Sequence, residues 1–214
     1  RVDSVVNSEI FTHSKFVAQL TKDAIVDQFR EATGRRPRVE LNQPNLVLVV
    51  HINKDRLTLS LDSSCDSLHM RGYRQETNDA PLNEVMAAGL VLLSGWDGKS
   101  NFVDPMCGSG TILIEAARYA FNISPMKSRT YFGFKNWKDF DYKIYEEVLA
   151  DIKSKEKITD IQIVGSEISL KTAQIAKKNI RIAGFDEGVI KIQSRAFQKM
   201  VPPPAPGVMI SNPP

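Results

Sequence analysis

A short sequence near the end of the chain has the residue types needed to hold a planar amine. Ser211-Asn212-Pro213-Pro214 follows the apolar run Val208–Ile210, which is typical of a strand. An exocyclic amino group on a base is a poor nucleophile because its lone pair is delocalised into the ring. An Asn side-chain oxygen and a backbone carbonyl can accept both amine hydrogens, and this aims the lone pair at a methyl donor. Because Asn-Pro also opens ordinary turns, the prediction depends on the residues upstream.

A glycine-rich turn upstream is suited to binding a ligand that lacks phosphate. Asp104–Gly110 lies between the strand-like Phe102-Val103 and a helical apolar pattern over 112–119. A dinucleotide loop would need glycine at position 113, which is Leu113, and the G-K-[S/T] of a phosphate loop is absent. S-adenosylmethionine (SAM) fits, and Asp104 could face its positively charged end. The alternative is a glycine turn that serves only helix packing.

A second strand ends in an acidic residue that could bind a ribose. The run 161–168 reads as a strand containing Glu167, and helical spacing follows from Leu170 to Ala183. An acidic side chain at the carboxyl end of the second strand of a doubly wound sheet can accept both ribose hydroxyl hydrogens. The alternative for Glu167 is a solvated residue near a helix start, where the helix dipole favours a negative charge.

Together these segments resemble a known enzyme family. The segments 104–111, 165–168 and 211–214 resemble motifs I, II and IV of class I SAM-dependent amino-methyltransferases. Leu68–Arg74, followed by Ala80–Ala88, is similar to the THUMP-domain bacterial methyltransferases that make N2-methylguanine in 23S ribosomal RNA. Members of that family are also often labelled N6-adenine-specific DNA methylases, since the Asn-Pro-Pro motif is shared.

The resemblance implies a role for each matching residue. The implied catalytic residues, which hold the target amine, are Asn212, Pro213 and Pro214. The family usually has an acidic residue after the third strand to bind adenine, but Ser194–Phe197 contains none, so backbone groups and Phe197 are expected there. The implied cofactor-binding residues are Asp104, Pro105, Cys107, Gly108, Ser109, Gly110, Glu167, Ile168, Pro81 and Asn83.

The expected fold is α/β, with a Rossmann-like, doubly wound class I methyltransferase sheet preceded by part of an α+β THUMP domain. We expect a partial THUMP-like RNA-binding domain over 1–70, a linker and the start of the motif X region over 71–81, and the methyltransferase domain over 82–214. Four strands are predicted in the last part: 101–104, 160–165, 189–193 and 207–211. A complete domain of this class would have three more, so we expect this sheet to be incomplete at its C-terminal side.

The first 70 residues contain candidate RNA contacts. A helix is predicted over 14–32, and alternating apolar runs over 46–53 and 56–61 predict a hairpin. A helix followed by paired strands is similar to the C-terminal half of a THUMP domain. Three arginines lie between the helix and the hairpin and either contact phosphate or form a solvated loop. Two more, near the domain junction, could touch RNA phosphate or the SAM carboxylate, or brace the linker. The predicted RNA-binding residues are Arg35, Arg36, Arg38, Arg71 and Arg74.

Composition sets the remaining expectations. The 214 residues carry a net charge of +3, which permits nucleic-acid binding without arguing for it. No apolar run is long enough to span a membrane, and the two cysteines and three histidines show no metal-ligand spacing, so no metal is expected and a cytoplasmic location is predicted. The leading hypothesis is methyl transfer from SAM to a guanine of 23S rRNA or its precursor. The alternatives are an N6-adenine DNA methyltransferase and a SAM- or RNA-binding fragment that is inactive by itself.

Overall fold

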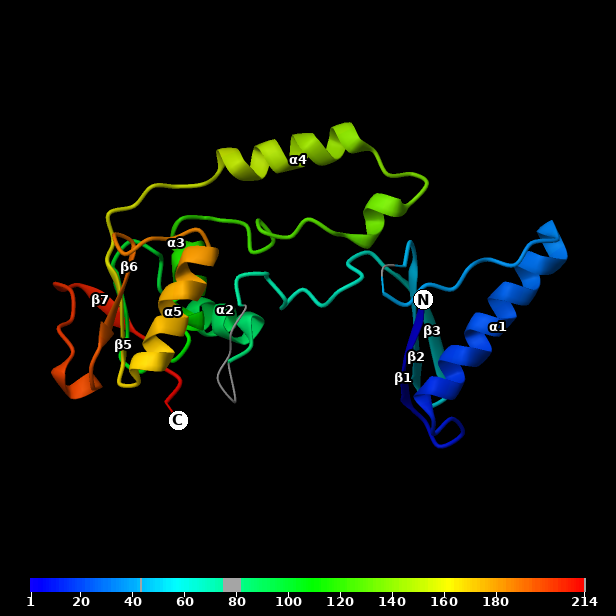
Figure 1. The fold of residues 1–214 in the computed structure, drawn as a ribbon, viewed down its shortest axis with the longest axis horizontal. Coiled ribbons are helices and arrows are strands. Elements are labelled where there is room, and N and C mark those ends of the chain that lie inside the picture. Colours follow the sequence, from blue (N-terminus) through cyan, green and yellow to red (C-terminus); the bar gives the residue numbers. More distant parts are fainter. Residues whose placement is uncertain (43, 75–81, 214) are drawn as a thin grey trace. The chain divides into compact units, whose positions relative to one another are not determined.

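Two separate sheets organise the chain in the computed structural model, which describes residues 1–42, 44–74 and 82–213 (Figure 1). The first unit comprises Arg1–Ser67 together with Thr130–Asp141, and the second comprises Leu68–Arg129 and Tyr142–Pro214. Within the described ranges, no helix is long and apolar enough to cross a membrane.

The first unit is a three-stranded sheet with one long helix. Strand β2 (Val47–Asn53) is central: it pairs in parallel with β1 (Val2–Asn7) and antiparallel with β3 (Arg56–Asp62). Helix α1 (Ser14–Thr33) lies alongside the sheet, and its Val17 packs on buried side chains of β2 (Figure 1). The helix ends at Gly34, which adopts a left-handed φ of 68°. The predicted helix and hairpin are present, whereas β1 had no prediction.

A segment from the second half of the chain completes this unit. Residues 130–141 include the short 3-10 helix η1 (Gly133–Asn136). The Phe134 amide donates to the Ser63 carbonyl at 3.0 Å, and the Tyr131 hydroxyl donates to the Pro44 carbonyl at 2.8 Å. The segment lies within 82–214, the range predicted for the methyltransferase domain, but its contacts group it with the first unit.

The second unit contains a parallel sheet in the order β6-β5-β4-β7. Its strands are β4 (Asn101–Asp104), β5 (Ile163–Glu167), β6 (Ile190–Ser194) and β7 (Gly207–Met209). Numbered along the chain this order is 3-2-1-4, which is one side and the centre of a doubly wound sheet. All four predicted strands are therefore present, and the predicted α/β fold class is confirmed.

Five helical elements accompany this sheet in the described part of the unit. They are α2 (Glu84–Leu93), α3 (Thr111–Ala120), α4 (Tyr142–Ser154), α5 (Leu170–Ile182) and the 3-10 helix η2 (Phe197–Lys199). Helix α3 follows β4 and is buried along nearly its whole length: most of its residues are small or apolar, and the charged Glu115 and Arg118 are buried as well. Helix α5 connects β5 to β6, and such crossovers between parallel strands are almost always right-handed.

The core of the second unit restricts one position of β5 to glycine. Phe102, Leu113 and Ile163 are fully buried, and the ring of Trp96 lies 4.8 Å from that of Phe102. A Cβ atom at Gly165 would lie 2.4 Å from Leu113 Cδ1 and 2.9 Å from Cys107 Sγ. Helix α3 therefore packs against the sheet as closely as it does because β5 has no side chain there.

We predict that Gly165→Ala lowers the free energy of unfolding by about 1–3 kcal/mol, since the added methyl overpacks the core. Gly89→Ala is the control, because a Cβ there meets nothing within 4 Å in the middle of α2. That change should raise stability by about 0.5–1 kcal/mol. Urea unfolding measures both, and an equal effect of the two changes would contradict the packing argument.

Candidate active site

A cavity of about 560 Å³ lies at the carboxyl ends of the parallel strands of the second unit. Ligands of doubly wound sheets bind at this edge, where the strand order reverses around the first strand. The loop after β4, the end of β5, the turn after β6 and the residues after β7 all contribute. The lining residues are Leu82, Asp104, Pro105, Met106, Cys107, Gly108, Ser109, Thr111, Ile112, Glu167, Ile168, Thr172, Ala196, Phe197, Gln198, Asn212 and Pro213.

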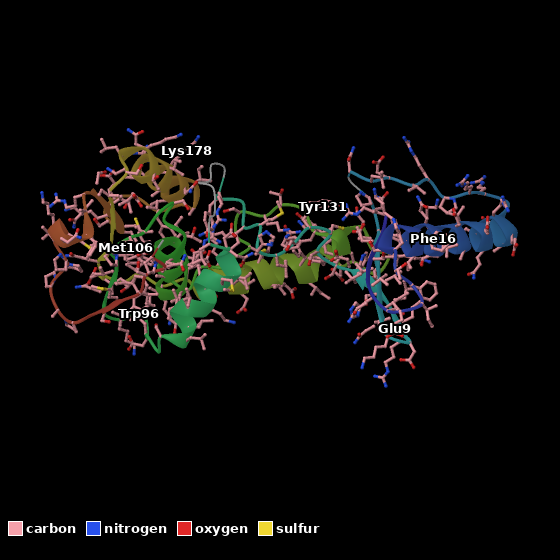
Figure 2. The ribbon with its side chains drawn as sticks, turned by 90° about the horizontal axis from the view of Figure 1, so that it is seen from below. Glu9, Phe16, Trp96, Met106, Tyr131 and Lys178 are labelled. Carbon is pink, nitrogen blue, oxygen red and sulfur yellow. The ribbon has the colours of Figure 1, made fainter. Side chains whose placement is uncertain are left out.

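The loop between β4 and α3 brings backbone groups close to this cavity. Gly108 and Gly110 have φ values of 53° and 85°, which glycine adopts without strain. The Cys107 amide donates to the Ser166 carbonyl at 2.9 Å, and the Asn179 side chain donates to the Ser109 carbonyl at 3.2 Å. These bonds fix the loop on β5 and α5. In Figure 2, Met106 of this loop lies between Lys178 on α5 and Trp96 beyond α2.

Asp104 is a buried carboxyl group at the base of the cavity. Its side chain is almost completely shielded, and Oδ1 accepts hydrogen bonds from the Ser211 hydroxyl at 2.8 Å and from the Met106 amide at 3.2 Å. Burial raises the pKa of Asp104 to about 6 despite these two bonds, and the nearby Glu167 adds to the rise. At neutral pH the group is charged in a poorly solvated place, which favours a cationic ligand.

Glu167 stands at the end of β5 with Ile168 beside it. Its Oε1 accepts a hydrogen bond from the Ser169 amide at 2.8 Å. The apolar side chains of Ile168 and Phe197 also line the cavity, although both are exposed. The site therefore presents a carboxylate and two apolar surfaces, as a nucleoside requires.

Asn212 and Pro213 reach the same cavity through the pairing of β7 with β4. The Ile210 amide donates to the Val103 carbonyl at 2.9 Å, and the Ser211 hydroxyl binds Asp104. The next two residues are exposed and line the cavity. The predicted amine-binding residues therefore lie beside the predicted cofactor-binding residues, except that Pro214 falls outside the described residues.

Most of the predicted cofactor residues line the cavity, whereas two of the described ones, Gly110 and Asn83, do not. Gly110 instead packs against α5: a Cβ atom at this position would lie 3.4 Å from the Cβ atom of Ala176. Asn83 caps α2, where its side chain accepts from the Val85 amide at 2.9 Å. Pro81 lies outside the described residues. No individual site role was predicted for Met106, Thr111, Ile112, Thr172, Ala196 and Gln198, which also line the cavity, whereas Leu82 lies in the segment 80–88 that carries the family resemblance. The signal for Met106, Thr111 and Ile112 was their position inside or next to the segment 104–111.

The predicted RNA-contacting arginines lie in two different environments. Arg35, Arg36 and Arg38 are exposed in the first unit, as a phosphate contact would need. Arg71 is buried and pairs with Glu115 at 3.1 Å, and the partly buried Arg74 lies 3.6 Å from Glu84. For these two, the structure agrees with the bracing alternative and argues against a contact with RNA phosphate.

In the ranges that the structure describes, no three or more His, Cys, Asp or Glu side chains lie together in a way that could hold a metal ion.

The strand order, the glycine loop and the Asn-Pro segment at one cavity define a Rossmann-like methyltransferase domain. Comparison with known families agrees. The chain belongs to the family described as the RMKL-like methyltransferase domain, which matches residues 71–214, and residues 2–62 match the THUMP domain. The family resemblance predicted from the sequence is confirmed.

Named relatives and solved structures extend this result. The chain is 39% identical over 211 residues to the ribosomal RNA large subunit methyltransferase K/L of Marinomonas sp. and 38% identical over 220 residues to that of Methylococcus capsulatus. These alignments cover 94% and 100% of the chain but 29% and 30% of the relatives, so the chain spans under a third of their length.

Two solved structures superimpose on the whole chain. SMU.472, described as a methyltransferase and complexed with SAH, is 32% identical with a TM-score of 0.85, and the match covers 57% of it. A protein from Listeria monocytogenes, named as a predicted N6-adenine-specific DNA methylase, is 31% identical with a TM-score of 0.85, and 56% of it is covered.

The buried carboxyl of Asp104 predicts a pH-dependent stability. Its folded pKa of about 6 is above the ordinary aspartate value of 3.8, so the folded state binds the proton more tightly than the unfolded state. The charged group therefore destabilises the fold above pH 6, by about 3 kcal/mol at most, and this penalty is relieved as the pH falls from 6 towards 4. Asp104→Asn keeps the oxygen that accepts both hydrogen bonds and should raise stability at pH 8.

Urea unfolding at several pH values tests this prediction. The gain from Asp104→Asn should shrink between pH 6 and pH 4. Asp151→Asn is the control, because its side chain is 57% exposed on α4, and it should change stability by less than about 0.5 kcal/mol. A gain that does not vary with pH would show that the charge of Asp104 is not its cause.

Proposed function

We propose that this chain carries the SAM-binding and amine-binding site of an RNA methyltransferase that methylates the exocyclic N2 of a guanine in 23S ribosomal RNA or its precursor. The observation that carries the proposal is the shared cavity: Asn212 and Pro213 line it together with Asp104 and Glu167. A donor site and an acceptor site for one transfer must adjoin, and here the β4–β7 pairing brings them together.

The cavity suits SAM. Asp104 offers a negative charge to the cationic end of the cofactor, and the loop 105–109 offers backbone groups to its amino-acid part. Glu167 would accept hydrogen bonds from the ribose hydroxyls, and Ile168 and Phe197 would offer apolar surface to adenine; all three line the cavity. When bound, the cofactor supplies a methyl group on a positively charged sulfur. The solved relative complexed with SAH supports this assignment.

The Asn-Pro segment would position the amine. Asn212 Oδ1 and the Pro213 carbonyl would each accept one amine hydrogen, which directs the nitrogen lone pair into the cavity. Pro213 would stiffen the turn because the φ angle of a proline is fixed. No strong base is needed, since the nitrogen becomes acidic as it gains the methyl group and can pass its proton to solvent. The contribution of the protein is therefore mainly positioning.

The THUMP domain supports RNA rather than DNA as the substrate. Residues 2–62 match that domain, and the relatives from Marinomonas and Methylococcus are named as ribosomal RNA methyltransferases. An adenine-specific DNA methyltransferase is the second candidate, because the Listeria relative carries that name and the Asn-Pro chemistry suits both amines. A cytoplasmic location, where ribosomal RNA is modified, is part of the proposal.

The role of Asn212 can be tested in the full-length protein. We predict that Asn212→Ala lowers kcat by about a hundredfold or more, because the lost contact acts on the reacting amine. The affinity for SAM, measured by calorimetry, should stay within a factor of two or so, since that contact is not made to the cofactor. Asn212→Asp, which keeps an acceptor oxygen, should retain more activity than the Ala variant. Unchanged turnover in Asn212→Ala would remove the residue from catalysis.

The exposed arginines of the first unit can be tested separately. Replacing Arg35, Arg36 and Arg38 by Ala should weaken RNA binding and reduce its salt dependence by up to about three units of slope, because each phosphate contact releases counterions. The control removes three charges of α1, at Lys15, Lys22 and Arg30, two of which have acidic neighbours. It should have a smaller effect, and equal effects would indicate unspecific charge attraction.

Nucleoside mass spectrometry of a deletion strain identifies the substrate. Loss of one N2-methylguanine from 23S rRNA is expected. If rRNA keeps all its N2-methylguanine and genomic DNA loses N6-methyladenine, the second candidate is correct.

A further inference from the structure

The segment Arg71-Gly72-Tyr73-Arg74 contributes a buried arginine, Arg71, and a partly buried one, Arg74, to the second unit. Their side chains are 8% and 13% exposed, and each faces a buried glutamate, Glu115 for Arg71 and Glu84 for Arg74. Removing two charges from water is costly unless each is paired and hydrogen-bonded. The segment thus has two similar ion pairs three residues apart, and the contacts of each pair indicate its role.

The Arg71 pair is enclosed within the fold. Glu115 lies in α3 and also accepts from the Tyr73 hydroxyl at 2.9 Å, while the guanidinium of Arg118 lies 5.1 Å from the centre of the Tyr73 ring. Burial raises the pKa values of both Glu115 and Tyr73. None of these residues lines the cavity. This pair holds the segment onto α3 and has no contact with the site.

The Arg74 pair reaches the wall of the cavity. Its Nη2 donates to the Thr111 hydroxyl at 2.9 Å and to the Leu82 carbonyl, while its Nε faces Glu84 Oε1 at 3.6 Å. Thr111 and Leu82 both line the cavity, from the start of α3 and from the approach to α2. The Thr111 hydroxyl is also 3.5 Å from that of Ser109 in the glycine loop.

We propose that Arg74 is a positioning residue for the cofactor: its guanidinium fixes the distance between Leu82 and Thr111 and so sets the shape of the SAM-binding cavity. The inference rests on the proposed function and deepens it. A guanidinium is suited to the task because its planar set of N–H groups can serve two acceptors while its charge faces a carboxylate. A lysine is a point charge on a flexible stem and cannot hold this geometry.

Two matched substitutions in the full-length protein test the proposal. Arg74→Lys and Arg71→Lys each keep the charge and weaken one buried pair, so both should lower the unfolding temperature. Only Arg74→Lys should weaken the binding of S-adenosylhomocysteine in calorimetry, by about tenfold, as expected for the loss of a hydrogen bond from a charged group. Arg71→Lys should bind it within a factor of about two of the wild type.

Steady-state kinetics separates positioning from a loss of folded protein. For Arg74→Lys, KM for SAM should rise with kcat at saturation little changed, whereas a smaller fraction of folded enzyme lowers kcat and leaves KM alone. Thr111→Val is the second variant, because it removes the acceptor of Arg74 without touching a charge. It should weaken binding, and Thr111→Ser, which keeps the hydroxyl, should not.

Each outcome decides a different point. If the wild type does not bind S-adenosylhomocysteine, the proposed function fails and the role of Arg74 fails with it. If the wild type binds but Arg74→Lys and Thr111→Val bind equally well, only the inference about Arg74 is overturned. If Arg71→Lys and Arg74→Lys weaken binding equally, both arginines are general stabilisers of the fold, which also overturns it.

Discussion

The parallel pairing of β7 with β4 is the constraint on which the site depends. It brings the turn after β7 beside the glycine loop after β4, although more than 100 residues separate them along the chain. The Ser211 hydroxyl reinforces the pairing by donating to Asp104 at 2.8 Å. One hydrogen bond therefore joins the segment proposed to hold the amine to the carboxyl proposed to face the cofactor. A transfer between two bound groups gains most from fixing their relative position, and this pairing provides that fixation.

Asp104 links the stability of the fold to its function. An Asp in this place is costly, since burial raises its pKa to about 6 and the charge persists at neutral pH. An isosteric Asn would keep both hydrogen bonds at no such cost. Active sites often retain a group that the fold would be more stable without. A cationic ligand would offset the penalty when it binds, so the buried charge favours the occupied state over the empty one.

The sequence predicted the local elements well because their signals are local. Helix α1, the β2–β3 hairpin, and the four strands of the second sheet each carry their own apolar periodicity and their own turn residues. Strand β1 was not predicted, because six residues with mixed polarity show no pattern until they pair with residues of β2 that lie 46 positions further along the chain. The assignment of 130–141 to the first unit could not be predicted for the same reason, since only its contacts with residues such as Ser63 determine it.

The polar residues in and near the site differ in whether their side chains are bonded to other groups of the protein or face the cavity. Arg71 and Asn83 stand in segments that resemble functional motifs, yet their side chains are occupied by Glu115 and by the start of α2. Asn212 is exposed at the cavity, where a ligand can reach it. Residue type and spacing cannot separate these cases. An arginine or asparagine in a motif looks identical in the sequence whether its side chain binds a ligand or another residue of the protein. Arg74 belongs to both groups: its partners are protein atoms, but two of them form the wall that a ligand would touch.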